Sequence, residues 1–149
     1  MRALLQRVQR AAVTVDDDTV GQIGLGWVIF VGVTAADTDE IAVKLAERAA
    51  NLRCFSDDQG KMNRSALDAH AEMLVISQFT LYAETARGRR PSFVQAAPPG
   101  HAKVLVNRFT ERLRELGLDV KTGRFGAHML VDILNDGPVT MMLDSEDRR

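Results

Sequence analysis

A short polar segment whose residue types could take part in catalysis or binding follows directly after an apolar stretch. Residues 73–76 are apolar, and the chain then reads Ser77, Gln78, Phe79, Thr80 and Leu81. Hydroxyls, a carboxamide and backbone amides at the end of a strand can hold a polar ligand or stabilise a developing oxyanion. A strand end that only satisfies its own turn can have the same composition, so the segment by itself leaves both interpretations open.

A second segment combines turn residues with flanking apolar stretches. It reads Asn135, Asp136, Gly137, Pro138, Val139 and Thr140. Local turn chemistry predicts a hairpin here, joining strands over residues 127–134 and 139–143. Composition favours a trans Gly137–Pro138 bond, since only about 5% of X-Pro bonds in folded proteins are cis.

A basic run lies in the least regular part of the chain, over residues 82–98. It contains Arg87, Arg89 and Arg90, separated by a glycine and followed by Pro91-Ser92-Phe93. A charge run of this kind is commonly a solvated loop. Its lack of acidic residues and its neighbouring phenylalanine suit contact with phosphates equally well.

The elements expected to position these segments alternate between strands and helices. Strands are predicted over residues 4–15, 20–23, 27–33, 72–77 and 120–122. The two strands on either side of residues 135–138 are added to these. Helices are predicted over 37–53, with an Asp37/Glu40 capping box, and over 99–116. About seven strands and two helices indicate an α/β chain of mixed, largely antiparallel sheets with the helices packed on them. With 149 residues and no internal linker, we expect one domain over 1–149.

Several common sites are excluded by the residues. The chain has one cysteine and three histidines without metal-ligand spacing, so neither a metal site nor a cofactor is expected. Cys54 is predicted to be a small buried hydrophobe. No phosphate-binding glycine loop occurs, and Ser77 is not in the Gly-x-Ser-x-Gly elbow of the α/β-hydrolases.

Bulk charge and hydropathy restrict the setting. No signal peptide is visible, and the apolar stretch 27–31 is far too short to span a bilayer, so a cytoplasmic location and no membrane association are expected. The formal net charge is −1, without the basic excess typical of nucleic-acid-binding proteins. Any contact with RNA must therefore use a local patch.

Taken together, the two signature segments resemble those of the D-aminoacyl-tRNA deacylases. The likeness runs nearly end to end. It includes Arg7-Val8 in the first predicted strand, the stretch from Arg90 to Phe93, and Phe125-Gly126-Ala127-His128-Met129 leading into residues 135–140. The resemblance implies hydrolysis of the ester of D-aminoacyl-tRNA, and of mischarged glycyl-tRNA, at the 3′ acceptor end.

The resemblance also implies an assembly and a chiral filter. The family is a homodimer with its active sites at the subunit interface. In it, a cis Gly137–Pro138 pair of one subunit would enter the pocket formed by Ser77 to Thr80 of the other. The two carbonyl oxygens would face the substrate α-carbon and exclude an L side chain. Arg7 would brace this pair, and Met129 would be a further substrate-binding residue.

Catalysis in this family does not need a strong side-chain base. The resemblance implies that the terminal 2′-hydroxyl of the tRNA assists the attack of water, and that the Phe79 amide stabilises the oxyanion. Thr80 as a nucleophile is a weaker alternative, since no neighbouring residue in the sequence would activate it. Two other functions remain open: a non-catalytic RNA-binding or ribosome-associated module using Arg87 to Arg90, and a thiol or serine hydrolase of small esters.

Overall fold

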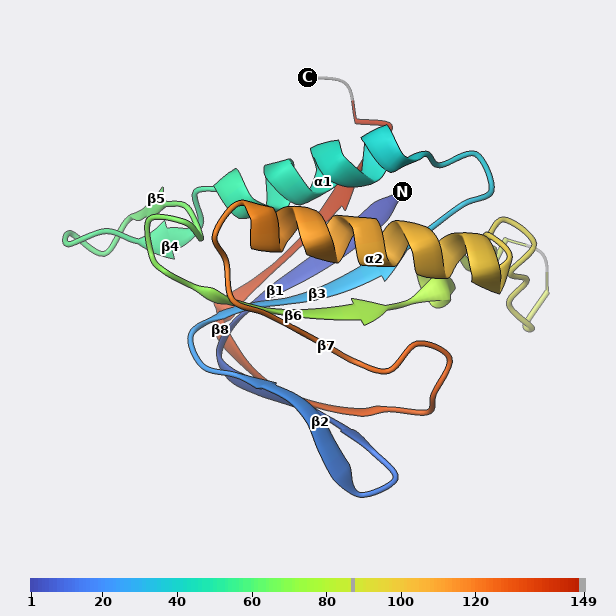
Figure 1. The fold of residues 1–149 in the computed structure, drawn as a ribbon, viewed down its shortest axis with the longest axis horizontal. Helices are drawn as coiled ribbons and strands as arrows, with labels where there is room; N and C mark the ends of the chain where they lie inside the picture. The colour runs from blue at the N-terminus through green and yellow to red at the C-terminus, as the bar shows by residue number, and fades with distance from the viewer. Residues whose placement is uncertain (87, 148–149) are drawn as a thin grey trace.

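A main sheet and two helices form most of the structure, a computed structural model that describes residues 1–86 and 88–147 (Figure 1). The sheet follows the order β2-β1-β3-β6-β7. Its strands are β1 (Arg2–Val15), β2 (Asp18–Ile23), β3 (Gly26–Gly32), β6 (Glu72–Ser77) and β7 (Val120–Thr122). A further strand, β8 (Leu130–Asp144), pairs with β1, and a separate small sheet joins β4 (Phe55–Ser56) to β5 (Met62–Arg64). The helices are α1 (Asp39–Asn51) and α2 (Pro99–Glu115).

The sheet is mixed, as the sequence predicts. Strand β1 is antiparallel to β2, β3 and β8, whereas β3 with β6 and β6 with β7 are parallel. The sequence predicts a central covered strand over residues 27–33, and β3 does lie between β1 and β6. The α/β class with two main helices on largely antiparallel strands is therefore confirmed.

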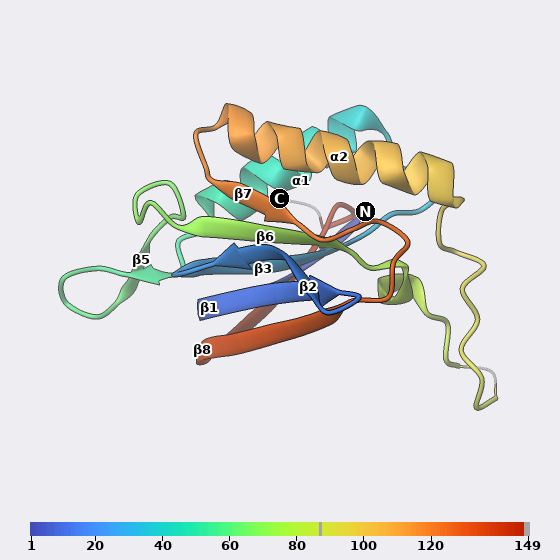
Figure 2. The same ribbon diagram turned by 60° about the horizontal axis from the view of Figure 1, so that its bottom comes forward.

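Helices α1 and α2 lie side by side over one face of the sheet (Figures 1 and 2). The larger apolar core lies beneath them and includes Leu5, Trp27, Leu45, Met73 and Phe109. A smaller core lies on the opposite face, where β1, β2 and β8 curve around Val28, Leu74 and Ile76. Alternate residues of β3 and β6 thus enter different cores, which explains why residues 27–31 and 73–76 are apolar without a break.

Strand β8 corrects the predicted hairpin. Residues 130–144 form one long strand, and both of its halves pair with β1. Gln6 faces Thr140 and Val8 faces Asn135, so the residues between Asn135 and Thr140 bulge out of the ladder. The prediction from local turn residues was wrong because β1 is long enough to pair with both halves. The Gly137–Pro138 bond is cis.

The start of α1 differs from the predicted capping box. Thr38 is the N-cap, and its hydroxyl accepts a hydrogen bond from the Ile41 amide at 3.4 Å. Asp37 instead accepts hydrogen bonds from the Thr34 amide and from the N-terminal amine of Met1. The second helix follows the prediction closely, with Pro99 in its first turn and Gly117 at φ +94° just after its end.

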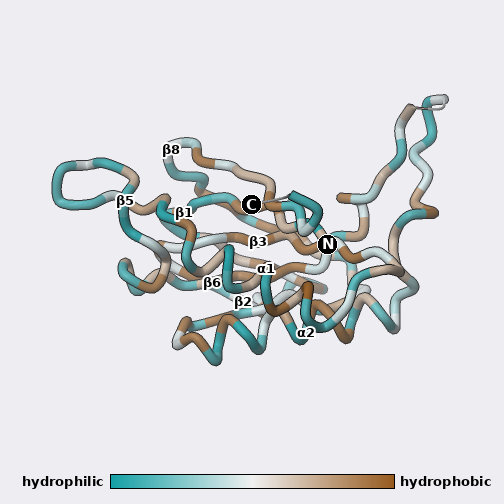
Figure 3. The backbone as a smooth tube through the Cα atoms, turned by 90° about the horizontal axis from the view of Figure 1, so that it is seen from above, coloured by the Kyte–Doolittle hydropathy of each residue, from teal (hydrophilic) through white to brown (hydrophobic). Residues whose placement is uncertain are grey.

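Within the described residues, neither helix is both long and apolar enough to cross a membrane. The hydropathy view shows instead that polar and apolar positions alternate along both helices (Figure 3). This pattern is typical of helices that cover a sheet on one side only.

Candidate active site

A cavity of about 760 Å³ opens at the end of the sheet where β3 and β6 finish. Its floor comes from Phe30, Val31 and Ile76. The polar segment predicted from the sequence forms one rim, since Ser77, Gln78 and Phe79 all line the cavity. A large, mostly apolar hollow with a few polar groups at one rim is the usual form of a small-molecule site.

The rim is built by a sharp change of backbone direction. Strand β6 ends at Ser77, the Gln78 amide donates to the Val31 carbonyl at 2.8 Å, and the chain then enters a 3₁₀ turn, η1 (Phe79–Tyr82). The first amides of such a turn have no carbonyl partner within it. The Phe79 and Thr80 amides are therefore available to an acceptor, as an oxyanion site requires.

Phe79 also forms part of an aromatic edge at the mouth of the cavity. Its ring packs edge-to-face against Phe93 with centroids 5.0 Å apart. Both rings are partly exposed, and the neighbouring Val94 is 87% exposed. Phe93 belongs to the irregular segment 83–98, which is thereby brought to the site.

Thr80 is placed differently from its neighbours. It does not line the cavity, and its hydroxyl accepts a hydrogen bond from the Gln78 side-chain amide. A carboxamide cannot take the proton of a hydroxyl, so nothing in this contact activates Thr80 as a nucleophile. In the described part of the chain, Ser77 likewise has no hydrogen bond to a histidine or carboxylate that would activate it.

The opposite wall comes, apart from Met129, from residues that the sequence analysis did not assign to the site. Residues 125–129 and 96–99 line the cavity, together with Ala102 and Val131. Met129, the one predicted residue among them, passes over Gly123 so closely that a Cβ there would lie 2.6 Å from the Met129 sulfur. Small residues such as Ala96 and Ala97 carry no chemical signal, and only the fold brings them to this wall.

The second signature segment, which contains Gly137 and Pro138, lies away from this cavity. Gly137 and Pro138 are exposed and do not line the cavity. Arg7 lies directly beside them. It is 8% exposed, and its Nη1 donates to the Cys54 carbonyl at 2.5 Å. Its Nε lies 3.2 Å from the Asp136 carboxylate, at ion-pair distance but without hydrogen-bond alignment.

The two signature segments are separated within one chain. Arg7 pairs with Trp27 at the start of β3, whereas Ser77 pairs with Val31 near its end. The intervening strand alone is about 13 Å long at the usual rise per residue. A single copy of the chain therefore does not bring Gly137-Pro138 to the cavity.

The comparison with protein-family models identifies the chain. The model described as D-Tyr-tRNA(Tyr) deacylase matches residues 4–144. The chain belongs to this deacylase family. The resemblance stated from the signature segments is thereby confirmed.

Curated relatives agree over almost the whole deacylase chain. A D-aminoacyl-tRNA deacylase of Roseiflexus sp. (strain RS-1) is 57% identical over 145 residues, covering 97% of this chain and 94% of that protein. One from Thermotoga petrophila is 54% identical, covering 97% of each.

Two solved structures share the deacylase fold. One, described as a c-Myc DNA Unwinding Element Binding Protein, is 40% identical with a TM-score of 0.92, covering 99% of this chain and 100% of that one. The other is described as a probable eukaryotic D-amino acid tRNA deacylase and is 20% identical with a TM-score of 0.83, covering 95% and 97%. At that identity the second shows the fold alone.

The thiol of this deacylase is poorly suited to nucleophilic chemistry. Cys54 is buried, as predicted, and burial raises the pKa of its thiol although the Arg7 charge opposes the shift. The neutral thiol is a weak nucleophile. Cys54 lies beside Arg7, which donates a hydrogen bond to its carbonyl, and is not in the lining of the cavity.

The basic run is described only in part. Arg89 and Arg90 are exposed and lie outside the cavity lining, in the segment that carries Phe93. Arg87 lies outside the described residues. Both arginines lie on a loop that is closed by the Glu84–Ser92 bridge and that leads directly into Phe93 at the mouth of the cavity.

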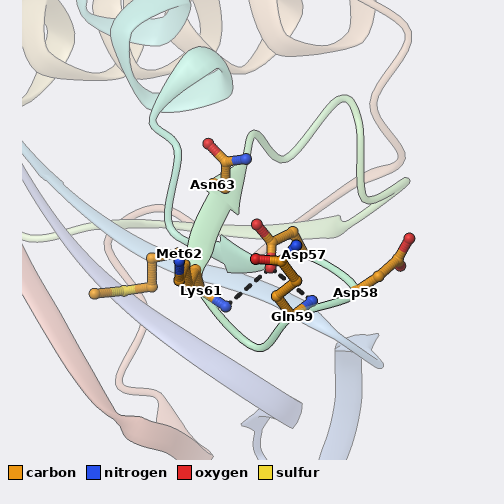
Figure 4. A pocket seen from close by; sticks show the side chains of 6 residues that line it. All are labelled: Asp57, Asp58, Gln59, Lys61, Met62 and Asn63. Atoms are coloured by element: carbon orange, nitrogen blue, oxygen red, sulfur yellow. Dashed lines mark hydrogen bonds between the residues drawn. The ribbon is translucent and has the colours of Figure 1, made fainter.

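A second hollow, of about 500 Å³, lies on the β4–β5 hairpin (Figure 4). The Asp57 carboxylate accepts hydrogen bonds from the amides of Gln59 and Lys61, which closes the turn. The Asp57 carboxylate is thus engaged in hydrogen bonds that hold the turn together. The β4–β5 hairpin lies at the opposite end of the molecule from the start of α2 and the loop before it (Figure 1), whose residues line the cavity.

Proposed function

We propose that this deacylase removes D-amino acids, and mischarged glycine, from tRNA by excluding L side chains from its pocket. The chain is a D-aminoacyl-tRNA deacylase by family, and therefore a carboxylic ester hydrolase. The finer proposal is that Gly137 and Pro138 of one subunit complete the cavity of a second copy. Free D-amino acid and tRNA are the products.

One observation carries the proposal: an exposed, braced Gly-Pro segment lies far from the cavity of its own chain. Strand β8 that bears it pairs with β1 alone among the described strands and exposes the apolar side chains of Leu130, Leu134 and Met142. An apolar edge of this kind favours contact with another chain. A two-fold dimer would cover it and bring each Gly-Pro segment to the partner's cavity.

The filter would work by exclusion. A pocket that accepts many side chains cannot recognise each of them, so it must read the substrate at its α-carbon. With the Gly137 and Pro138 carbonyls beside that carbon, a hydrogen fits and an L side chain collides. The D side chain then points to the open mouth of the cavity, where its size has little effect.

The hydrolytic step needs few protein groups. Water attacks the ester carbonyl, the tRNA 2′-hydroxyl assists the proton transfer, and the Phe79 amide stabilises the tetrahedral oxyanion until the ribose oxygen leaves with a proton. An ester is an activated acyl group, so positioning and oxyanion stabilisation suffice. No metal or cofactor enters this scheme.

Replacing Thr80 or Cys54 should therefore have small effects. We expect Thr80→Ala to keep kcat within about tenfold of the parent, because the substitution removes only an orienting hydrogen bond to Gln78. Cys54→Ala and treatment with a chelator should leave the rate unchanged. Steady-state release of tyrosine from D-tyrosyl-tRNA measures all three. A covalent aminoacyl-enzyme trapped on Thr80 or Ser77 would overturn this mechanism.

The basic run should contribute to tRNA binding. Replacing Arg89 and Arg90 by alanine should weaken the affinity and reduce the salt slope by about one for each phosphate that is no longer neutralised. The preference for D over L substrates should not change. Alanine at Lys44 and Lys61, which lie on α1 and the β4–β5 loop, is the matched control. An affinity and slope equal to the parent's would return these arginines to the role of a solvated loop.

A binding function without catalysis is the alternative class. The relative described as a DNA-binding protein makes duplex DNA a useful competitor in the same titration. The net charge of −1 gives little general attraction for a duplex. Release of the amino acid from D-aminoacyl-tRNA separates the deacylase from a non-catalytic module, which binds without turnover. Activity on esters that lack RNA identifies a small-ester hydrolase.

A further inference from the structure

The position of η1 depends on a contact from the far edge of the sheet. Three residues face one another across neighbouring strands: Asp144 on β8, Arg2 on β1 and Gly32 on β3. The Arg2 guanidinium donates to the Asp144 carboxylate at 2.8 Å through Nε, and to the Leu81 carbonyl at 3.0 Å through Nη1. Leu81 belongs to η1, so one side chain joins the sheet edge to the turn at the cavity rim.

Gly32 makes this contact possible. A Cβ at Gly32 would lie 3.0 Å from Leu81 Cβ, 3.1 Å from the Gln78 carbonyl oxygen and 3.2 Å from Tyr82 Cδ2. The turn therefore sits directly on the glycine backbone. The missing side chain lets η1 approach the strand closely enough for Arg2 to reach it.

Arg2 is itself held on two further sides. Its guanidinium carbon lies 4.6 Å from the centre of the ring of Tyr82, which is buried. Asp144 is fixed through its carbonyl, which accepts a hydrogen bond from Arg48 on α1 at 2.7 Å. Burial acts to raise the pKa of Asp144, but hydrogen bonds from Arg2 and from the Glu146 amide together lower it by more. The pKa is therefore below its ordinary value, and the carboxylate stays charged opposite Arg2.

We propose that Arg2 and Asp144 are positioning residues for deacylation: they fix the Leu81 carbonyl and, with it, the turn that presents the Phe79 amide to the ester. The catalytic half of this inference rests on the proposed function. A shift of about 1 Å in a positioned group can cost a factor of about a hundred in rate. Loss of this clamp should therefore lower kcat rather than weaken binding of the tRNA.

The test compares the clamp with an exposed ion pair on α1, away from the cavity and from the exposed edge of β8. Arg2→Met and Asp144→Asn each break the clamp, whereas Lys44→Met breaks the Lys44–Glu40 pair, whose side chains are 67% and 76% exposed. Two quantities are measured for each variant. One is kcat and KM on D-tyrosyl-tRNA, and the other is the hydrogen-exchange rate of the Leu81 and Ala83 amides, which donate to carbonyls within the turn and its first flanking residue.

We expect Arg2→Met to lower kcat by about tenfold or more, with KM within about twofold, and to speed exchange of both amides. Asp144→Asn should act in the same direction, and the double variant should be no worse than the stronger single variant, because the pair acts as a unit. Lys44→Met should match the parent in all measurements.

Other outcomes would overturn the inference. Unchanged exchange of both amides in Arg2→Met would show that Arg2 does not hold the turn. A raised KM with unchanged kcat would make Arg2 a tRNA contact instead. If Arg2→Met fails to fold, Asp144→Asn keeps the test open. A parent protein that releases no tyrosine would refute the proposed function and the catalytic half of the inference, while the exchange rates would still decide whether the clamp holds η1.

Discussion

Alanine at Gly137 should abolish deacylation while leaving most of the fold intact. Gly137 has φ +117°, a backbone conformation that costs a residue with a side chain about 1–3 kcal/mol. A Cβ there would also lie 2.7 Å from Val139 Cγ2 and 2.9 Å from the Val139 amide. The segment must move to relieve these contacts, and the carbonyls that we propose face the substrate then move with it. We expect kcat/KM on D-tyrosyl-tRNA to fall by at least about a hundredfold.

Gly60→Ala is the matched control for backbone strain. Gly60 also has a positive φ, of +75°, but no atom lies within 4 Å of the position that a Cβ would take. It lies on the β4–β5 loop, away from both signature segments. Gly60→Ala should lose a similar amount of stability from the conformation alone and keep full activity. A Gly137→Ala variant as active as Gly60→Ala would remove this segment from the mechanism.

Two inactive variants should restore activity when they form a mixed dimer. Phe79→Pro removes the amide that we propose stabilises the oxyanion, at a position where proline suits the first residue of the turn. Gly137→Ala disturbs the segment that we propose acts as the filter. In a mixed dimer, the intact cavity of the Gly137→Ala chain would receive the intact Gly137-Pro138 of the other chain. Co-refolding equal amounts should recover about a quarter of the parental rate, since half the dimers are mixed and each has one good site.

The same experiment separates three arrangements. If Gly137-Pro138 served the cavity of its own chain, neither chain in the mixture would have a complete site and no activity would return. A monomeric enzyme would behave in the same way. Each variant refolded with itself gives the baseline, and light scattering at micromolar concentration reports the mass of the mixed species.

Local signals predicted the elements well where neighbouring residues decide the structure. Strand β6 ends at Ser77 as expected, and α2 runs from Pro99 with Gly117 just beyond its end. The hairpin at residues 135–138 failed for a physical reason. Its turn residues are consistent with a reversal, but pairing with a 14-residue β1 overrides them and turns the segment into a bulge.

The candidate site was predictable only in part. The chemical segments at Ser77–Phe79 and at Gly137-Pro138 are visible because their residue types are unusual for their places. The cavity wall at Ala96, Ala97 and Ala102 gives no such signal, since these residues reach the site only through the packing of α2 and its preceding loop. The Arg2 contact was hidden likewise, because it depends on the register of three strands.

The central claim is that the Gly137-Pro138 segment filters substrates by chirality, and the rates on D- and L-tyrosyl-tRNA test it most directly. Release of tyrosine is followed under identical conditions, with D-aspartyl-tRNA as a substrate whose side chain differs in size and charge. The account predicts similar rates for both D substrates and a rate on L-tyrosyl-tRNA lower by about a thousandfold, as a steric conflict of about 4 kcal/mol gives. Comparable rates on D- and L-tyrosyl-tRNA would contradict it.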